Sequence, residues 1–381
     1  MTDRAADPPR RALLWLAILL TLTACAPRAR LVVVPEAGEI GTTHTLFVAT
    51  TRAREAEAKG IEPFGAVRSE TLRRARVAVS VPPAHQLGDI TYPGARPDPR
   101  TEFVASEIRE YDRAAQFRRD LGAALRRLPP ARRQAVVFVH GFNTNFAEGV
   151  YRFAQLLHDF EIDGVPVHYS WPSLASPLGY QYDRDSTVFS RDGLEETLRD
   201  VARAGAPSIT IVAHSLGAFL AMETLRQLAI GGDKDTLQRI DGVILLSPDI
   251  DVDVFRAQVR RLPRLPQPFV IITSRRDRAL KLSALLTGQD QRLGNLRDVW
   301  RVADLDVTIL DTSEFDDGDA LRHFQVASSP VLIQILRSLR RVDNAFAGDV
   351  SGRTGLFPGT VLTVQRATAI ILAPMGAPTT R

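Results

Sequence analysis

The chain has 381 residues, of which 45% are hydrophobic and 24% charged, so it can bury a substantial core and is not broadly disordered. Its formal net charge is +4, and the basic residues are nearly all arginines scattered between acidic residues. A nucleic-acid-binding surface would gather them on one face or interleave them with aromatic residues, so we expect no nucleic-acid partner.

The N-terminal segment has the features of an export signal. Three arginines within the first eleven residues precede an uncharged apolar stretch at residues 12–22, which is too short to span a bilayer as a helix. The sequence Leu-Thr-Ala-Cys follows and ends at Cys25, the only cysteine of the chain. This order resembles a bacterial lipoprotein signal, which predicts a signal peptide over residues 1–24 and lipidation of Cys25.

The residues around Cys25 extend this prediction to location. A single cysteine leaves no partner for an intramolecular disulfide, so the core alone must stabilise the fold. Ala26 stands where an aspartate would be associated with inner-membrane retention, so the resemblance favours a lipid anchor in the outer membrane of the cell envelope, facing the periplasm. The alternatives are an ordinary secretory signal, or a weak membrane anchor with a chance cysteine. We expect residues 25–41 to form a tether.

After the tether, short β-rich runs come first. Residues 44–51 and 73–82 have the pattern of strands, and because no crossover helix joins them they can pair antiparallel at one edge of a sheet. Residues 83–100 are rich in proline and glycine, which predicts a loop. Apolar residues at helical spacing predict a helix over residues 105–128, ended by Pro129 and the proline that follows it.

The rest of the chain alternates strands with helices. A continuous apolar run at residues 135–140 predicts a strand buried on both faces. The pattern predicts an α/β fold over residues 42–344, with a mostly parallel central sheet and helices on both faces. The extension at 345–381 contains a segment that predicts a hairpin or an edge strand, and no function follows from it. The further predicted strands are residues 165–171, 208–214, 242–247, 268–274 and 306–311, and the helices are 146–160, 190–204 and 330–342.

A serine stands between a predicted buried strand and an amphipathic helix. The sequence at residues 213–217 is Ala-His-Ser-Leu-Gly, and a sharp strand-to-helix turn there would present the Ser215 hydroxyl above the sheet edge as a nucleophile. The usual pattern has glycine where Ala213 stands, and alanine is the least bulky replacement. The helix would begin at the serine and favour an anion there. The alternative is a tight turn without a catalytic role.

A nucleophilic serine needs a base, and the base needs an orienting acid. With this turn, the expected chain order is serine, acid, histidine, and His323 is the only histidine after Ser215. His323 is therefore the predicted base, with a surface or capping histidine as the alternative. Asp277 follows the strand at 268–274, at the strand end where α/β sites assemble, and is the predicted acid. The rival acids are Asp249, Asp251 and Asp253.

The three rival aspartates have the spacing of a calcium-binding loop. Such a loop needs glycine at its sixth position and glutamate at its last, and the chain has Val254 and Arg260 there. We therefore expect no metal site in this run, and the chemistry of a serine nucleophile requires neither a metal nor an organic cofactor.

Acyl transfer also needs two donors for a developing oxyanion. The backbone N–H of Leu216, the residue after the nucleophile, is the first candidate, and the loop after residues 135–140 supplies the second. There Gly141 permits close approach, and Phe142 or Asn143 would offer the N–H. His140 precedes the serine and is interpreted as shaping this loop.

Three residues are candidates for lining an acyl pocket. Trp171 and Tyr180 follow the next predicted strand, and Asn143 lies on the candidate oxyanion loop. Packing is an equal alternative for Trp171 and Tyr180. Helix N-capping is the alternative for Asn143 and for Asn145.

Taken in order, these motifs resemble the α/β-hydrolase superfamily. More narrowly, the chain is similar to a family of bacterial hydrolases of unassigned function marked by FVATTR, VHGFN, HSLG and SPDIDVDVF. The resemblance covers residues 44–342 and implies a catalytic serine, base and acid at Ser215, His323 and Asp277. It implies no particular substrate, because one fold serves many chemistries. The motifs lie at residues 47–52, 139–143, 214–217 and 247–255.

From these observations we predict a serine hydrolase that cleaves a carboxylic ester or thioester through an acyl-enzyme. The expected substrate is a small-molecule ester or a lipid. The alternatives are a peptidase or amidase, or a non-catalytic envelope lipoprotein that uses the fold as a binding scaffold. The complete order of serine, acid and histidine argues against the scaffold, which has no need of it.

Overall fold

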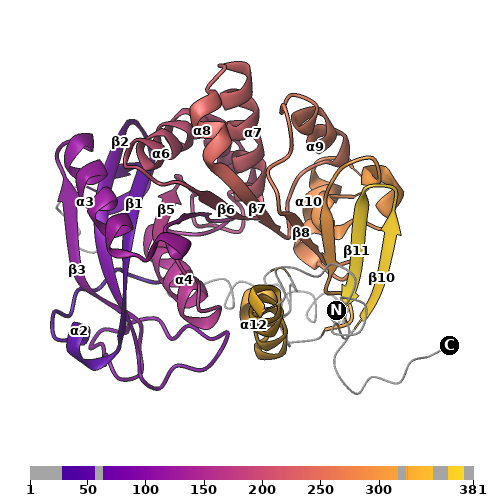
Figure 1. Ribbon diagram of the computed structural model, residues 1–381. Helices are drawn as coiled ribbons and strands as arrows, with labels where there is room; N and C mark the ends of the chain where they lie inside the picture. The colour runs from indigo at the N-terminus through magenta and orange to yellow at the C-terminus, as the bar shows by residue number, and fades with distance from the viewer. Residues whose placement is uncertain are drawn as a thin grey trace, which may run out of the picture.

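In the part of the chain that the computed structural model describes, the fold is built around a mixed β-sheet of eleven strands. Figure 1 shows how the elements are arranged. The strand order is β10-β11-β9-β8-β7-β6-β4-β5-β1-β2-β3. The predicted signal peptide and Cys25 lie outside the described residues. The structure describes residues 28–55, 63–289, 291–315, 323, 325–345 and 359–372.

The strands from β11 through to β1 run parallel, whereas β10 at one edge and β2 and β3 at the other pair antiparallel. This confirms the predicted mostly parallel sheet and the antiparallel pairing of the first two strands. The strand bounds are β1 Thr42–Arg54, β2 Phe64–Val81, β3 Val104–Tyr111, β4 Ala135–Val139, β5 Val165–Ser170, β6 Ile209–His214, β7 Ile240–Leu246, β8 Phe269–Thr273, β9 Thr308–Asp311, β10 Gly359–Val364 and β11 Ala367–Leu372.

Helices cover both faces of the sheet, and Figure 1 shows α7, α8 and α9 above it and α4 and α12 below it. Successive residues of a strand point to opposite faces, so Val137 of β4 belongs to one core and Phe138 to the other. The helix bounds are α2 Ala37–Ile40, α3 Ala114–Arg127, α4 Phe146–Asp159, α5 Tyr180–Phe189, α6 Arg191–Arg203, α7 Leu216–Ile230, α8 Lys234–Arg239, α9 Val252–Val259, α10 Arg278–Leu286, α11 Gln325–Ser328 and α12 Pro330–Ala345.

The predicted helix over residues 105–128 is wrong in its first part. Residues 104–111 form edge strand β3, and only Ala114–Arg127 is helical. Ile108 and Tyr111 are spaced as on a helix, yet both pair with β2, Ile108 opposite Val77 and Tyr111 opposite Arg74. Pairing with the long strand β2 outweighs the helical spacing of the apolar residues, because it gives the backbone N–H and C=O groups of β3 hydrogen-bond partners. The sequence pattern does not predict helix α5 either.

The tether prediction is wrong for the residues that the structure describes, 28–41. Ala29 and Leu31 are buried, and the Val34 N–H donates to Ala105 O at 2.7 Å. The Ala105 N–H in turn donates to Val32 O at 2.9 Å. These hydrogen bonds attach the segment to edge strand β3, so residues 29–34 are part of the folded domain.

The C-terminal extension contains the predicted hairpin, β10–β11, which confirms that prediction. Strand β11 pairs parallel with β9, with Ala369 opposite Ile309, so the domain continues beyond residue 344. Ala367 and Leu372 are buried, which makes the hairpin part of the core. Among the described residues, no helix combines the length and the apolar character needed to cross a bilayer.

We predict that Ala369→Asp destabilises the whole domain. Ala369 is 3% exposed between β9 and β10, and an unpaired carboxylate there should lower the free energy of unfolding by about 3 kcal/mol or more. Thr363→Asp, on the exposed part of the same hairpin, should change it by less than about 0.5 kcal/mol. Urea denaturation followed by circular dichroism measures both. A loss of free energy of unfolding in Ala369→Asp as small as that in Thr363→Asp would show that the hairpin is not integral to the fold.

Candidate active site

Ser215 occupies a sharp turn between β6 and α7, as the sequence predicts. Its backbone has φ 52° and ψ −123°, a strained conformation for a residue with a side chain, and α7 begins at the next residue. The Ser215 N–H donates to Leu246 O at 3.0 Å, and the Asp249 N–H donates to Ser215 O at 3.2 Å. Contacts with the neighbouring strand therefore hold the strained turn in place.

Two glycines allow the turn after β4 to approach this serine. A Cβ atom on Gly217 would lie 2.2 Å from His140 O. A Cβ atom on Gly141 would lie 2.9 Å from Ser215 Cβ and 2.4 Å from His214 Nδ1. Neither position can hold a larger residue without moving the backbone, so the two turns are in direct contact.

The structure brings Ser215, His323 and Asp277 together. His323 Nε2 lies 2.8 Å from Ser215 Oγ, and His323 Nδ1 lies 2.7 Å from Asp277 Oδ2. When Nδ1–H donates to the carboxylate, Nε2 is left to accept the serine proton. Asp277 is fully buried, and its Oδ1 accepts the Leu280 N–H at the start of α10. The first turn of α10 therefore fixes the position of the Asp277 carboxylate.

The rival acids are engaged elsewhere. The Asp249 carboxylate accepts hydrogen bonds from Tyr180 and Ser283 and forms a buried ion pair with Arg292 at 3.0 Å. Asp251 caps α9, where its side chain accepts the N–H groups of the second and third residues after it. Asp253 is exposed and pairs with Arg301. The structure therefore brings Asp277, and none of these three, to His323.

His214 packs against the predicted base, a contact that the sequence analysis did not identify. The two rings lie 4.8 Å apart at their centroids, and His214 Nε2 is 3.4 Å from His323 O. Burial, with a smaller contribution from His323, holds the pKa of His214 well below its ordinary value. His214 is therefore neutral and can donate Nε2–H to that carbonyl, which helps to position His323. The position of His214 directly before Ser215 in HSLG is the sequence feature that points to this contact.

The candidate oxyanion donors lie in the two touching turns. Leu216 is the first residue of α7, so its N–H has no acceptor within the helix. The Asn143 N–H donates to Asp183 Oδ2 at 3.0 Å, which leaves Phe142 as the candidate on the other turn. Asn145, rather than Asn143, caps α4 through a reciprocal pair of hydrogen bonds with Glu148. The oxyanion role of Leu216 and Phe142 stays a prediction.

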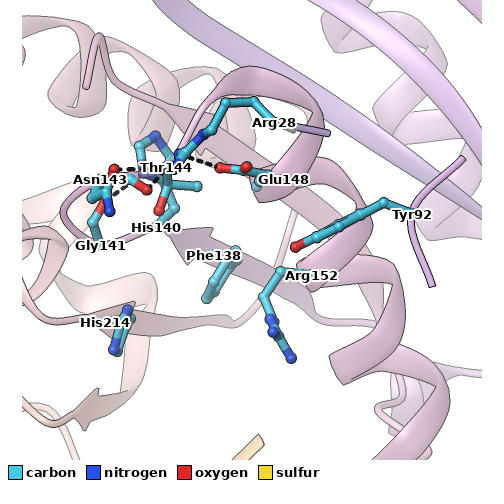
Figure 2. Close-up of a pocket in the computed structure, with 11 residues that line it drawn as sticks. Arg28, Tyr92, Phe138, His140, Gly141, Asn143, Thr144, Glu148, Arg152 and His214 are labelled. Atoms are coloured by element: carbon cyan, nitrogen blue, oxygen red, sulfur yellow. Dashed lines mark hydrogen bonds and ion pairs between the residues drawn. The ribbon is translucent and has the colours of Figure 1, made fainter. Parts of the chain in front are cut away.

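A cavity of about 280 Å³ lies beside the two turns (Figure 2). Asn143 lies at its edge, together with Gly141 and His214. In Figure 2, Arg152 and the Tyr92 hydroxyl also lie on its wall. The remaining lining residues are Arg28, Phe138, His140, Thr144, Glu148 and Gly149.

The other two predicted pocket residues have packing contacts. Trp171 is fully buried, stacks on His140 at 4.7 Å between ring centroids, and donates from Nε1 to His140 O. The Trp171 ring therefore supports the turn from within the core, and its role in a pocket stays a prediction. Tyr180 packs edge-on against Phe142 at 5.5 Å and lies beside that turn.

Arg52 holds the loops around the site, a role that the sequence analysis did not assign to the last residue of FVATTR. It is 1% exposed, and its guanidinium donates to Ser170 Oγ, to Thr144 O and to Ser173 O. A fourth bond runs to Gly65 O. The planar five-donor group suits this set of three carbonyls and one hydroxyl on separate segments of the chain.

Comparison with known proteins gives a family match. A family model described as "Alpha/beta hydrolase of unknown function (DUF900)" matches residues 114–340. No curated protein matches the chain.

Solved structures give weaker likenesses. A predicted CIB-like hydrolase from Thermoplasma acidophilum is 17% identical, with a TM-score of 0.32 over 56% of this chain and 89% of that one. An esterase of Rhizomucor miehei is 11% identical, with a TM-score of 0.34 over 81% of this chain and 86% of that one. An esterase from Pyrobaculum calidifontis is 13% identical, with a TM-score of 0.32 over 91% of this chain and 95% of that one. At these values the likenesses carry no argument about activity.

We predict that Arg52→Lys destabilises the protein and disturbs the site. Lysine keeps the charge but cannot reach all four acceptors, so buried carbonyls lose their donors. The free energy of unfolding should fall by about 2–3 kcal/mol. Arg54→Lys, two residues along β1 where the side chain is 60% exposed, should cost less than about 0.5 kcal/mol. Denaturant titration of both variants checks this, and equal losses would contradict the assigned role of Arg52.

Proposed function

The chain belongs to the family of α/β-hydrolases whose model matches residues 114–340, and from this premise we propose that it is a serine hydrolase acting on carboxylic esters or thioesters. The observation that carries the proposal is the hydrogen-bonded series from Ser215 Oγ through the His323 ring to the buried carboxylate of Asp277. A serine that is merely part of a tight turn has no need of an oriented imidazole and a buried acid.

In the proposed reaction, Ser215 Oγ attacks the carbonyl carbon of the ester while His323 Nε2 takes the hydroxyl proton. The oxyanion that forms accepts hydrogen bonds from the Leu216 and Phe142 amides. The tetrahedral intermediate expels the alcohol or thiol, which receives its proton from His323, and leaves an acyl group on Ser215. Water then attacks the acyl-enzyme with His323 again as base, releasing the acid and restoring the serine.

Asp277 has an orienting role in this mechanism. It holds His323 in the tautomer with the proton on Nδ1 and stabilises the imidazolium that forms during each step, without taking up the proton itself. Its fixed position at the N-terminus of α10 supports this role, because the Leu280 N–H and the His323 ring occupy different oxygens of the same carboxylate.

We further propose that Cys25 carries a lipid anchor and that the enzyme resides in the cell envelope, facing the periplasm. Arg28 donates hydrogen bonds to Glu148 and to Asn143 O, at the rim of the cavity. Three residues extend at most about 11 Å, so a lipid on Cys25 would keep this rim close to the membrane surface. That proximity favours a lipid or another membrane-associated ester as substrate.

We predict that a fluorophosphonate probe labels Ser215. Ser215→Ala should abolish labelling, and His323→Ala should lower kcat for a nitrophenyl ester by about 10⁴–10⁶-fold, because the serine loses its base. Asp277→Asn should lower kcat by about 10⁴-fold through loss of the correct tautomer.

The same substitution at the rival acid, Asp249→Asn, is the matched control. Because Asp249 lies in a separate network with Tyr180 and Arg292, the folded fraction of that variant should still be labelled. Labelling that survives in Asp277→Asn and disappears in folded Asp249→Asn would contradict the assigned acid. Folded wild-type protein that resists the probe would contradict the hydrolase mechanism.

The lipid anchor is tested separately in bacterial cells. We predict that wild-type protein fractionates with the outer membrane and that mass spectrometry finds acyl groups on Cys25. Cys25→Ser should release the protein from membranes, and Ala26→Asp should shift it to the inner membrane. An unmodified Cys25, or a Cys25→Ser variant that stays membrane-bound, would refute the anchor while leaving the catalytic proposal intact.

A further inference from the structure

Three histidines and an aspartate from separate segments meet at the C-terminal end of α4. His158 and Asp159 end that helix, His85 lies in the loop after β2, and His44 lies near the start of β1. Helix α4 begins beside the active-site turn and has 14 residues, so its far end is about 20 Å from that turn. The cluster is thus separate from the proposed catalytic centre.

The distances between the polar atoms of the cluster suit a small cation. One ligand atom each from His85, His158 and Asp159 can be chosen so that all lie within 4.8 Å of one another. His44 Nε2 lies 3.4 Å from His158 Nδ1. In a tetrahedral zinc site with Zn–N bonds of about 2.0–2.1 Å, neighbouring ligand atoms are about 3.3–3.4 Å apart. His85 Nε2 and Asp159 Oδ1, which are 2.5 Å apart, would therefore separate by about 1 Å when they bind the ion.

The Asp159 carboxylate is positioned as metal-ligating carboxylates are. It is fully buried, and its Oδ2 accepts hydrogen bonds from the Gly88 N–H at 2.7 Å and from Gln155 Nε2 at 2.5 Å. Its Oδ1 faces His85 Nε2 at 2.5 Å. One oxygen is therefore fixed by two donors while the other is directed at His85, and such supporting bonds orient metal ligands.

We propose that His85, His158 and Asp159 form a zinc-binding site, with His44 packed beside His158. Two imidazoles and one carboxylate are ligands that zinc accepts, and a water molecule would complete the four-coordinate set. A bound ion would join the loop after β2 and the end of α4. The ordinary alternative is a His85–Asp159 ion pair with the other two histidines packed around it.

The site is also linked to the segment that follows the proposed base. Gln155 Nε2, which supports Asp159, donates as well to Ala327 O of α11 at 3.0 Å. Gly88 packs so closely on this segment that a Cβ atom there would lie 2.4 Å from Ser328 O. A metal ion held by Asp159 would therefore steady the backbone a few residues after His323.

The test uses the full chain, stripped of metal with a chelator and then titrated with zinc chloride in a calorimeter. We expect one zinc ion per chain and a rise in Tm on loading. His85→Gln and His158→Gln should each weaken binding by at least about 100-fold, and Gln155→Ala by about 10–100-fold. His323→Gln is the matched control and should bind zinc as wild type does, which separates this site from the histidines near Ser215.

Two results would overturn the proposal. Zinc affinity that is unchanged in folded His85→Gln and His158→Gln would place the ion elsewhere, and absence of any stoichiometric binding would favour the ion-pair alternative. Cobalt(II) gives an answer on wild-type protein if the variants do not fold. Intense visible bands typical of tetrahedral cobalt support the site, whereas the weak bands of a six-coordinate aqua ion contradict it.

Discussion

The site depends on the contact between two backbone turns, the one after β4 and the one that carries Ser215. Gly217 packs on His140 O and Gly141 packs on Ser215 Cβ, so the two turns meet without intervening side chains. Strands β4 and β6 are neighbours in the sheet, which aligns the turns before any side chain is considered. The positive φ of Ser215 is strain that this contact and the bond to Leu246 O hold in place.

Buried charges support the turn after β4 from behind. The Arg52 guanidinium donates to Thr144 O, and the Asp183 carboxylate accepts from the Asn143 N–H. Burial raises the pKa of Asp183, opposed by its hydrogen bonds to Ser173, Leu174 and Asn143 and by the charge of Arg52. Buried charged groups persist only when paired and hydrogen-bonded, so these two residues fix the turn in one geometry.

The sequence was informative where function depends on local pattern. The small residues around Ser215, the chain order and the strand before Asp277 were enough to predict three residues that the structure brings together. It was misleading where a distant partner decides the structure. The Val34 N–H bonds to Ala105 O of edge strand β3, and Ile108 of β3 pairs with Val77 of β2. Arg52 bonds to a loop carbonyl more than 90 residues away. No window of a single sequence contains such contacts.

The position of His323 illustrates how the two kinds of information combine. Its place in the chain, after β9, indicates the correct end of the sheet, but a strand end alone does not bring a ring within 2.8 Å of a serine. His323 O lies 3.4 Å from the His214 ring at the end of β6, and Ala327 O, four residues later, accepts a hydrogen bond from Gln155 of α4. Because α4 also carries Asp159 at its far end, one helix connects the histidine cluster with the segment that follows the base. The alignment of His323 with Ser215 is therefore a property of the α4 layer as much as of the sheet.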